Sequence, residues 1–384
     1  MVKKILYCAT VDYHFKAFHL PYMKWFKEQG WQVDVASAGE MDLAYTDNKY
    51  NISIKRSPFH HSNLKAYQQL KQIIDQNDYD LIHCHTPLGG VLGRLAGRQA
   101  RKKGTKIIYT AHGFHFCKGS PKLNWLIYYP IEKYLARFTD LLITINQEDF
   151  NLAKKHHFQA EHIVKVNGVG VDTNHFKPID KLNKLRLKKA FGYKPDDFLL
   201  FYAAEFNKNK NHQFLLHSLA LIKEKLPNVK LLLAGEGSLL EDSIKLAKQL
   251  NIRESVDFLG FRTNIHEILS ICDVAVATSL REGLPVNVME AMSCALPVVA
   301  IDNRGHRELV SDSQTGWLLE RMDPKVYSNK ILILAEVEEL TEQFGMNGRK
   351  TIIETYSINK VLADLTSIYE FLMDKQEDML WAAQ

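Results

Sequence analysis

The sequence predicts an α/β protein made of two doubly wound parallel sheets, each in its own domain. Three observations support this prediction. The 384 residues exceed the length that one hydrophobic core normally serves. Short β-type runs alternate with helical patterns along the chain, which is typical of parallel sheets with helices on both faces. The alternation closes and then restarts near residue 180, as expected for two units in tandem.

The first domain is expected to span residues 1–180. Its expected strands are Lys4–Ala9, Gln32–Ala36, Leu81–His83, Lys106–Thr110 and Leu141–Ile145, and the pattern closes near Val164–Asn167. Helical patterns separate these runs at Pro21–Gln29, Ala66–Gln76, Gly90–Lys102 and Lys122–Arg137.

The second domain is expected to span residues 181–356, after a polar, proline-containing linker at Phe176–Lys184. Helical character continues from Val326 to Leu372, and a terminal helix at about residues 357–384 is expected to pack back on the first domain. The expected strands are Phe198–Ala203, Lys230–Ala234, Val256–Phe258, Val274–Ala277 and Val298–Ala300. The expected helices are His212–Lys225, Leu239–Leu250, Asn264–Ser270 and Pro285–Ser293.

Composition indicates a globular protein, with 46% hydrophobic and 24% charged residues. No apolar run reaches the ~18 to 20 residues that a transmembrane helix needs. The apolar part of Met1–Thr10 is too short for a signal peptide and fits a buried first strand better. The five cysteines are scattered and form no metal or disulfide pattern, which favours a reducing cytoplasm.

Charge is divided unevenly along the chain: residues 1–180 carry a net +8 and residues 181–384 a net −3. The basic half could serve an anionic membrane surface or a phosphorylated substrate, although a solvated surface explains it as well. The aromatic segment Trp125–Tyr129 either contacts a membrane or belongs to the core of its helix. No nucleic-acid recognition motif accompanies the charge, so nucleic acid is not an expected partner.

Two common classes of nucleotide-binding protein fit this sequence poorly. The first class is identified by glycines in the turn that follows the first strand. This turn, Thr10–Lys16, contains no glycine, whereas a dinucleotide site needs GxGxxG there. A phosphate-loop GxxxxGK[ST] is also absent from the sequence. Dehydrogenase and P-loop kinase functions are therefore poor fits.

The segment Ser279–Met292 contains the most informative motif of the chain. It follows a strand-like run, turns at Gly283, and starts a helix at Pro285, with Glu282 and Glu290 eight residues apart. Free backbone N–H groups at a helix start attract phosphate. Glu290 could reach ribose hydroxyls, and Glu282 could face a sugar or its leaving phosphate. The arrangement suits a nucleotide-sugar site, although alone it also fits an ordinary strand-loop-helix unit.

Histidines follow two strands of the first domain. His83 and His85 point to one side of a strand, which suggests either a metal pair or hydrogen-bonding side chains, and the latter is favoured because no third ligand is evident. His112 lies at the end of the next strand, where a neutral imidazole can donate a hydrogen bond to a sugar.

Two loops of the second domain lie where a ligand is expected, just beyond strand ends. Lys210 comes before a helix and can neutralise a diphosphate leaving group, with the surface residue Lys208 as a less favoured alternative. The run Gly235-Glu236-Gly237 places small residues where a ligand or another part of the chain passes closely. The GxG pattern alone is weak evidence.

Together these motifs resemble glycosyltransferase family 4. The most specific element is the E-x7-E pair, Glu282 and Glu290, with Gly283-Leu284-Pro285 after the first glutamate. His112, Lys210, Gly235–Gly237 and Leu259–Arg262 stand in the expected order around it. The resemblance covers nearly the whole chain and implies the GT-B fold, with two Rossmann-like domains facing across a cleft.

The resemblance also implies roles for individual residues. His112 and Glu282 would be the catalytic residues, and Glu290 would contact the ribose of the donor. Transfer would proceed with retention from a uridine-diphosphate-type sugar, and neither a metal ion nor another cofactor is expected. The expected donor-binding residues are Lys210, Gly235, Glu236, Gly237, Arg262, Asn264, Gly283, Leu284, Pro285, Glu290, Arg304 and Arg307.

This sequence departs from the family pattern at two positions. Glu205 replaces the arginine that often contacts the donor phosphate, so we expect it to point elsewhere or to pair with a neighbour. We expect Arg304 or Arg307 to supply the missing charge. In the first turn, polar residues replace a Gly-Gly loop, so the acceptor-side candidates are His14, Lys16 and His115.

The segment from Tyr7 to Trp25 looks similar to transferases of bacterial capsule and exopolysaccharide assembly. This similarity implies a saccharide acceptor on a polyprenyl diphosphate, in the cytoplasm or at the inner face of the plasma membrane. Two alternatives remain open: a nucleotide-sugar 2-epimerase of the same fold, and a non-catalytic partner of another transferase.

Overall fold

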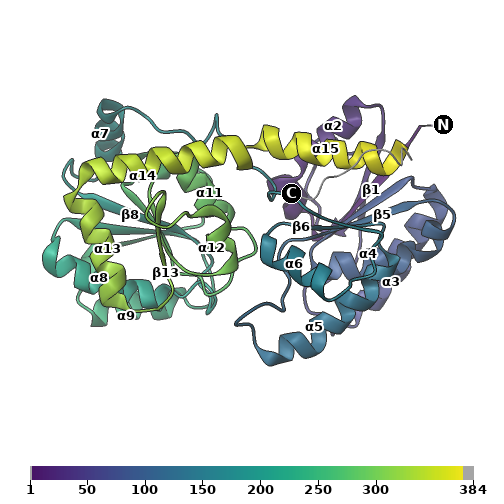
Figure 1. Ribbon diagram of the computed structural model, residues 1–384, viewed down its shortest axis with the longest axis horizontal. Helices are drawn as coiled ribbons and strands as arrows, with labels where there is room; N and C mark the ends of the chain where they lie inside the picture. The colour runs from purple at the N-terminus through teal and green to yellow at the C-terminus, as the bar shows by residue number, and fades with distance from the viewer. Residues whose placement is uncertain (1, 375–384) are drawn as a thin grey trace. The chain divides into compact units, whose positions relative to one another are not determined.

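The structure, a computed structural model, describes residues 2–374 of the chain (Figure 1). Contacts within the chain divide it into two compact units. Of the described residues, one unit holds 2–169 together with 361–374, and the other holds Gly170–Lys360. Each unit is built on one parallel sheet with helices packed against it. The predicted fold class, two doubly wound parallel sheets in tandem, is confirmed.

The sheet of the first unit has seven strands in the order β3-β2-β1-β4-β5-β6-β7. The winding direction reverses between β1 and β4, so the loops that follow these two strands diverge and leave a crevice for side chains. The strands are β1 (Lys4–Val11), β2 (Gln32–Ala38), β3 (Asn48–Asn51), β4 (Leu81–His85), β5 (Lys106–Ala111), β6 (Leu141–Thr144) and β7 (His162–Lys165).

Helices cover both faces of this sheet. In Figure 1, α2 and α15 lie on one side of it, and α3, α4 and α5 lie on the other. The helices are α1 (Tyr13–Phe18), α2 (Leu20–Glu28), α3 (Ser62–Asn77), α4 (Pro87–Lys102), α5 (Lys122–Leu135), α6 (Gln147–Lys155) and α15 (Ile358–Asp374), with a short 3₁₀ turn at Ala136–Phe138.

A buried ion pair fixes α5 against α4. Arg94 and Glu132 are both buried, and the Arg94 guanidinium donates to the Glu132 carboxylate at 2.7 Å. The guanidinium also lies 3.9 Å from the centroid of the Tyr109 ring, whose hydroxyl donates to Glu132 at 3.2 Å. A buried charge is costly unless it is paired, so these three side chains have to stay together.

The last helix completes the core of the first unit, where its described residues pack against β4 and α2. The Tyr369 hydroxyl lies 2.9 Å from His83 Nδ1. The Tyr369 ring packs against Trp25 and Phe26, with centroid separations of 6.0 and 4.8 Å. These residues close the face of the sheet that α2 covers only in part. The end of the expected terminal helix, 375–384, lies outside the described residues.

The sheet of the second unit has six strands in the order β10-β9-β8-β11-β12-β13. Here the winding direction reverses between β8 and β11, so the loops after these strands are the expected place for a ligand. The strands are β8 (Phe198–Ala203), β9 (Val229–Ala234), β10 (Val256–Gly260), β11 (Val274–Ala277), β12 (Val298–Ile301) and β13 (Gly316–Leu319).

Several helices of the second unit are preceded by a polar residue that caps the first turn. Asn303 precedes α12, and Asp323 precedes α13; each side chain accepts hydrogen bonds from two backbone N–H groups of the first turn. The helices are α7 (Lys181–Ala190), α8 (His212–Lys225), α9 (Leu240–Gln249), α10 (Ile265–Ile271), α11 (Val286–Ser293), α12 (Arg304–Leu309), α13 (Pro324–Glu336) and α14 (Glu338–Thr351), with short turns at Arg253–Ser255 and Ile352–Tyr356.

The segment expected to be a linker, Phe176–Lys184, belongs to the second unit instead. Asp180 caps α7, so its polar residues begin a helix. The Lys184 ammonium donates to Asp273, and the Phe176 carbonyl accepts from the Ser293 hydroxyl at 2.6 Å. Upstream of this segment, Val171 forms a β-bridge with Ser357. This bridge joins the chain to the second unit before residue 180.

A helix that crosses a bilayer needs about 20 predominantly apolar residues. Within residues 2–374, none of the helices combines the length and the apolar character that crossing a membrane requires.

Candidate functional site

Two neighbouring loops of the second unit carry several of the predicted donor-side residues. One loop joins β8 to α8, and the other joins β11 to α11. Because β8 and β11 are adjacent parallel strands, both loops leave the same edge of the sheet. The Leu280 N–H donates to the Asn209 carbonyl at 2.8 Å, and the Thr278 hydroxyl donates to the Lys210 carbonyl at 3.0 Å. These hydrogen bonds hold the two loops together.

Lys210 and Glu282 form an ion pair across these loops. The Lys210 ammonium lies 2.5 Å from Glu282 Oε1, and both side chains are largely buried. The sequence predicts a separate role for each of these two residues and does not predict their contact. The structure thus brings the predicted phosphate-binding cation and the predicted catalytic carboxylate to one place.

Arg304 lies at the same place, whereas Arg307 pairs with an aspartate. Arg304 is only 8% exposed, and its Nε donates to the Glu282 carbonyl at 2.9 Å. Arg307 Nε lies 2.6 Å from the carboxylate of Asp302, and the Arg307 side chain is 47% exposed. Of the two arginines proposed to replace the missing phosphate contact, Arg304 therefore borders the Lys210–Glu282 pair.

Glu290 is positioned by α11, one helical turn beyond the loop that contains Gly283, Leu284 and Pro285. Its carboxylate has no hydrogen bond or ion pair within the described part of the chain. Burial raises the pKa of Glu290 to about 7, because the charged form loses hydration. A carboxylate with unused acceptor oxygens can accept hydrogen bonds from hydroxyl groups of a ligand.

The Gly235-Glu236-Gly237 loop packs against the backbone that follows β8. The Phe206 N–H donates to the Glu236 carbonyl at 2.8 Å. A Cβ atom at Gly235 would lie 2.2 Å from the Ala204 carbonyl oxygen, and one at Gly237 would lie 2.5 Å from the Phe206 carbonyl oxygen. Of the two explanations open for this GxG, the close approach of another part of the chain accounts for both glycines.

Arg262 and Asn264 lie together at the start of α10. Arg262 Nε donates to the Asn264 side-chain oxygen at 3.1 Å, and the Asn264 amide donates to Glu267 at 2.7 Å. This chain of hydrogen bonds orients both side chains before any ligand binds. It is compatible with the predicted contact to a base, which stays a prediction.

Glu205, the residue in place of the usual arginine, is exposed. Within the described part of the chain its carboxylate forms no ion pair, so of the two expectations for Glu205 the structure supports the one that it points elsewhere.

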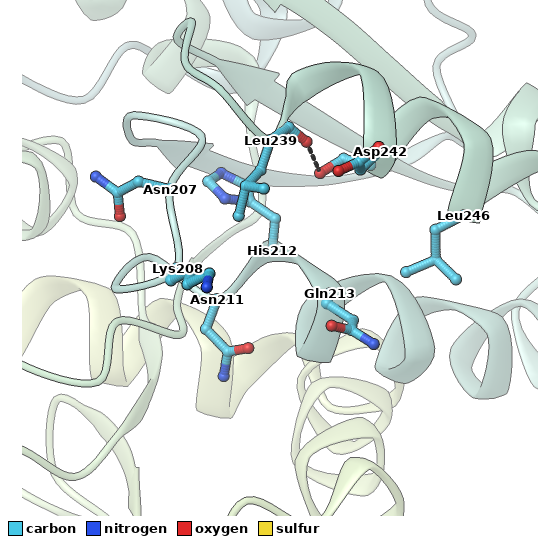
Figure 2. Close-up of a pocket in the computed structure, with 9 residues that line it drawn as sticks. Asn207, Lys208, Asn211, His212, Gln213, Leu239, Asp242 and Leu246 are labelled. Carbon is cyan, nitrogen blue, oxygen red and sulfur yellow. Dashed lines mark hydrogen bonds between the residues drawn. The ribbon is translucent and has the colours of Figure 1, made fainter.

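Lys208 lies in different surroundings from Lys210. It lines a cavity of about 530 Å³ with residues of α8 and α9, among them His212 and Asp242 (Figure 2). Figure 2 shows His212 in the middle of this group, beside Leu239. None of the predicted donor-binding residues lines this cavity. Lys208 therefore lines the cavity, whereas Lys210 contacts Glu282.

In the first unit, His112 belongs to a cluster of buried and partly buried imidazoles. His112 Nε2 lies 3.2 Å from His85 Nδ1, and His14 Nε2 lies 3.0 Å from His19 Nε2. One ring nitrogen from each of these four residues lies within 4.8 Å of the others. Burial lowers the pKa of His112 to about 4 and those of the other three well below their usual value, so all four rings are neutral near pH 7.

His83 differs from the four clustered histidines. Its Nδ1 lies 2.9 Å from the Tyr369 hydroxyl, and its Nε2 lies 2.8 Å from the Thr110 hydroxyl. The hydrogen-bonding role favoured for His83 is confirmed. For His85 the expectation is only half met, because its Nε2 is buried without a hydrogen-bond partner.

The acceptor-side candidates divide into two groups. His14 and His115 line one cavity of about 470 Å³, together with Arg56 and Tyr128. Lys16 is exposed and does not line this cavity. The structure therefore brings two of the three candidates to one cavity.

Sequence reasoning missed His19, and it did not connect His85 with His112. The residues themselves gave a usable signal: His14 lies in α1 and His19 directly follows it, while His85 ends β4 and His112 directly follows the neighbouring parallel strand β5. Strand ends that meet at one edge bring such residues together. Only the turn between α1 and α2 could not be placed from the sequence.

Comparison with known proteins identifies the family of this chain. The family described as glycosyl transferases group 1 matches residues 183–351, and the one described as glycosyl transferase 4-like matches residues 4–146. EpsD of Bacillus subtilis (strain 168), named as a provisional glycosyltransferase, is 49% identical over 97% of this chain and 98% of its own length. The chain belongs to glycosyltransferase family 4.

A second relative of this family 4 glycosyltransferase has a more specific name. It is the UDP-Gal:alpha-D-GlcNAc-diphosphoundecaprenol alpha-1,3-galactosyltransferase of Escherichia coli, 28% identical over 80% of this chain and 79% of that protein. Among solved structures, Anabaena HepE in complex with UDP and glucose superimposes with a TM-score of 0.79 at 20% identity. That alignment covers 96% of the family 4 glycosyltransferase and 99% of HepE, and it shows the shared GT-B fold.

Proposed function

We propose that the protein transfers a hexosyl or N-acetylhexosaminyl group, with retention, from a UDP-sugar to a polyprenyl-diphosphate-linked saccharide in capsule or exopolysaccharide synthesis. The observation that carries this proposal is the meeting of Lys210, Glu282 and Arg304 at the β8 and β11 loop ends. Family membership and the names of EpsD and the galactosyltransferase support the reaction class and the kind of acceptor.

In this proposal, Lys210 and Arg304 receive the negative charge of the donor diphosphate. A lysine and an arginine next to a leaving phosphate stabilise the charge that develops during transfer, so no resident metal is needed for this step. Glu290 accepts hydrogen bonds from the ribose. Glu282 faces the sugar, and the leaving phosphate helps to deprotonate the acceptor hydroxyl. The predicted roles of His112, His14, Lys16 and His115 belong to the same proposal.

A test begins with a thermal-shift screen of nucleotide sugars, because a ligand at 100 times its Kd adds about 2.7 kcal/mol of stability. The stabilising donor is then incubated with polyprenyl-diphosphate-linked GlcNAc in the presence of EDTA. We expect glycosyl transfer, with the anomeric configuration of the product read by NMR. An isomerised donor formed without acceptor would indicate the 2-epimerase, and donor binding without transfer would indicate a non-catalytic partner.

We also propose that the protein works in the cytoplasm, with α5 against the inner face of the plasma membrane. The aromatic residues Trp125, Tyr128 and Tyr129 are partly buried and pack against the core of the first unit, whereas Leu126 of the same segment is exposed. The exposed apolar residues of α5 instead recur at helical spacing: Leu123, Leu126, Pro130 and Tyr134. Lys122 and Arg137 lie at the two ends of this stripe and can attract anionic lipid.

Liposome flotation tests this membrane contact. We expect binding to vesicles that contain anionic lipid, and a loss of binding in Leu123→Gln/Leu126→Gln. Leu182→Gln is a matched control, because Leu182 is 59% exposed in the second unit and Leu123 is 61% exposed on α5. Equal flotation of all three proteins would contradict the assignment of α5 as the contact surface.

A further inference from the structure

The four clustered histidines of the first unit have the makeup of a metal site. His14, His19, His85 and His112 each direct one ring nitrogen into a common space, and all four nitrogens lie within 4.8 Å of one another. Four nitrogens at about 2.0 Å from a tetrahedral Zn²⁺ would be separated by about 3.3 Å. The two closest pairs, at 3.0 and 3.2 Å, are already near this separation.

In the part of the chain that the structure describes, the hydrogen bonds of these rings lead only to each other. His14 pairs with His19, and His85 pairs with His112. Among the described residues, no carboxylate or lysine is bonded to any of the four rings. Each pair shares one hydrogen between two nitrogens, and imidazole can move its proton to the other ring nitrogen. All four inward nitrogens can thus offer a lone pair at once.

His85 also has a ring nitrogen without a hydrogen-bond partner among the described residues. It is 1% exposed, and its Nε2 has no hydrogen-bond partner in the described structure. A buried polar nitrogen without a partner is costly and calls for an explanation such as an ion or a bound molecule. His83, whose ring centroid lies only 4.0 Å from that of His85, has partners for both nitrogens and is therefore not part of the site.

We propose that His14, His19, His85 and His112 bind one divalent transition-metal ion of the Zn²⁺ class. Neutral imidazole is a preferred ligand of Zn²⁺, Co²⁺ and Ni²⁺ and a poor one for Mg²⁺ or Ca²⁺. The ligands come from α1, from the turn between α1 and α2, and from the ends of β4 and β5. An ion held there would tie the α1–α2 turn to the strand ends at the crevice of the sheet.

This site is separate from the proposed handling of the donor diphosphate, since every ligand belongs to the first unit. Because His112 and His14 also have roles in the proposed transfer, metal binding is measured directly and not through glycosyl transfer, so that failure of one proposal can be told from failure of the other. The full-length protein is first treated with EDTA and dialysed. Co²⁺ is then added, because four-coordinate Co²⁺ has visible absorption bands, and Zn²⁺ is added afterwards to displace it.

We expect the visible bands of four-coordinate Co²⁺ to saturate at one ion per chain and to disappear when Zn²⁺ is added. His14→Gln, His85→Gln and His112→Gln should each weaken Zn²⁺ binding, measured by competition with a chromophoric chelator. Loss of a ligand should cost more than the about 10- to 100-fold that loss of an outer hydrogen-bond partner costs. Circular dichroism of the metal-free variants checks folding, and the partly exposed His14 keeps the test usable if a buried substitution unfolds the unit.

Two controls distinguish this site from other histidines. His212 is buried in the second unit, and both of its ring nitrogens lack partners, so His212→Gln matches the burial of the cluster. His60 is an exposed histidine next to His61, so His60→Gln reports on surface binding. Neither should change the Co²⁺ spectrum. Absence of visible bands in the wild-type protein, or full Zn²⁺ affinity in folded His14→Gln and His85→Gln, would overturn the proposal.

Discussion

The Lys210 ammonium lies 2.5 Å from Glu282 Oε1, so two residues expected to act on the donor neutralise each other in this structure. A diphosphate that binds Lys210 must therefore compete with a carboxylate of the protein. The competition favours a doubly charged phosphate group over a neutral sugar as the partner of Lys210. When Lys210 turns to the phosphate, the acceptor oxygens of Glu282 become available to sugar hydroxyls, which links recognition of the two parts of the donor.

Replacement of Lys210 should weaken donor binding. We expect Lys210→Ala to lower the affinity for UDP-sugar by about 10- to 100-fold, because a charge-assisted hydrogen bond contributes about 1.5 to 3 kcal/mol. Lys208→Ala is the control, since Lys208 lines the cavity of Figure 2 instead. Isothermal titration calorimetry measures both. A larger loss in Lys208→Ala than in Lys210→Ala would reverse the assignment of the two lysines.

The two candidate arginines should behave differently. Arg304 contacts Glu282, whereas Arg307 forms an ion pair with Asp302. We expect Arg304→Ala to weaken UDP binding by about tenfold or more, and Arg307→Ala to change it by less than about twofold. Titration calorimetry with UDP alone provides the measurement. Equal affinities for both variants and the wild-type protein would mean that neither arginine replaces the missing phosphate contact.

Glu290 should make the stability of the second unit depend on pH. Its pKa is raised from 4.5 to about 7, so between these values the folded protein holds a proton that the unfolded chain has lost. The free energy of unfolding should therefore fall as pH rises through this window and stay low above it. Glu290→Gln removes this penalty, and we expect it to be more stable than wild type by up to about 3 kcal/mol above pH 7.

The same substitution should reduce transfer, because a neutral amide replaces the carboxylate that accepts ribose hydroxyls. Urea unfolding at pH 4 and pH 8 measures the stability, with little difference between the two proteins expected at pH 4. A Glu290→Gln protein that is less stable than wild type at pH 8 would show that the carboxylate has a stabilising partner. Undiminished turnover would contradict its donor role.

Gly235 should tolerate no larger residue. A Cβ at Gly235 would lie 2.2 Å from the Ala204 carbonyl oxygen, whereas a Cβ at Gly192 would meet nothing within 4 Å. Both glycines have positive φ angles, 145° and 85°, so both alanine variants bear a backbone cost. We expect Gly235→Ala to lose about 1 to 3 kcal/mol more than Gly192→Ala. Urea unfolding curves compare them, and equal losses would rule out the steric explanation.

The hydrogen bond between Tyr369 and His83 should contribute to the stability of the first unit. Tyr369→Phe leaves the buried His83 Nδ1 without a partner, which should cost about 1 to 3 kcal/mol. Ser367→Ala, on the exposed face of the same helix, should change the stability by less than about 0.5 kcal/mol. Thermal unfolding measures both variants. If the two had the same Tm, the buried hydrogen bond would not be holding the last helix in place.

The central strands could be predicted from the sequence because they are buried on both faces and read as apolar runs. Phe198–Ala203 and Val274–Ala277 have the predicted bounds. Two strands at sheet edges were missed. They are β3, Asn48–Asn51, which is polar and partly exposed, and β13, Gly316–Leu319. Such strands are defined by their pairing partners and not by their own periodicity.

The positions of the candidate site loops could be predicted from the sequence, but the contacts between their side chains could not. Topology alone places the loops that follow adjacent strands at one edge of the sheet. Lys210 and Glu282 could therefore be chosen as candidates from the sequence. Which side chains then touch depends on loop conformation. The contact between Lys210 and Glu282, the partner of Arg304, and the meeting of His14 with His85 through the α1–α2 turn are therefore features that only the structure provides.

The division of the first unit between the two ends of the chain also has a consequence for biosynthesis. Its sheet is encoded before Val169, but Tyr369 and its neighbours are translated only after the whole of Gly170–Lys360. At about 5 to 20 residues per second, that interval lasts roughly 10 to 40 s. Until then Trp25, Phe26 and His83 lack the helix that covers them. The part of the protein that leaves the ribosome first is therefore the last to be finished, and it is the part that a chaperone would have to protect.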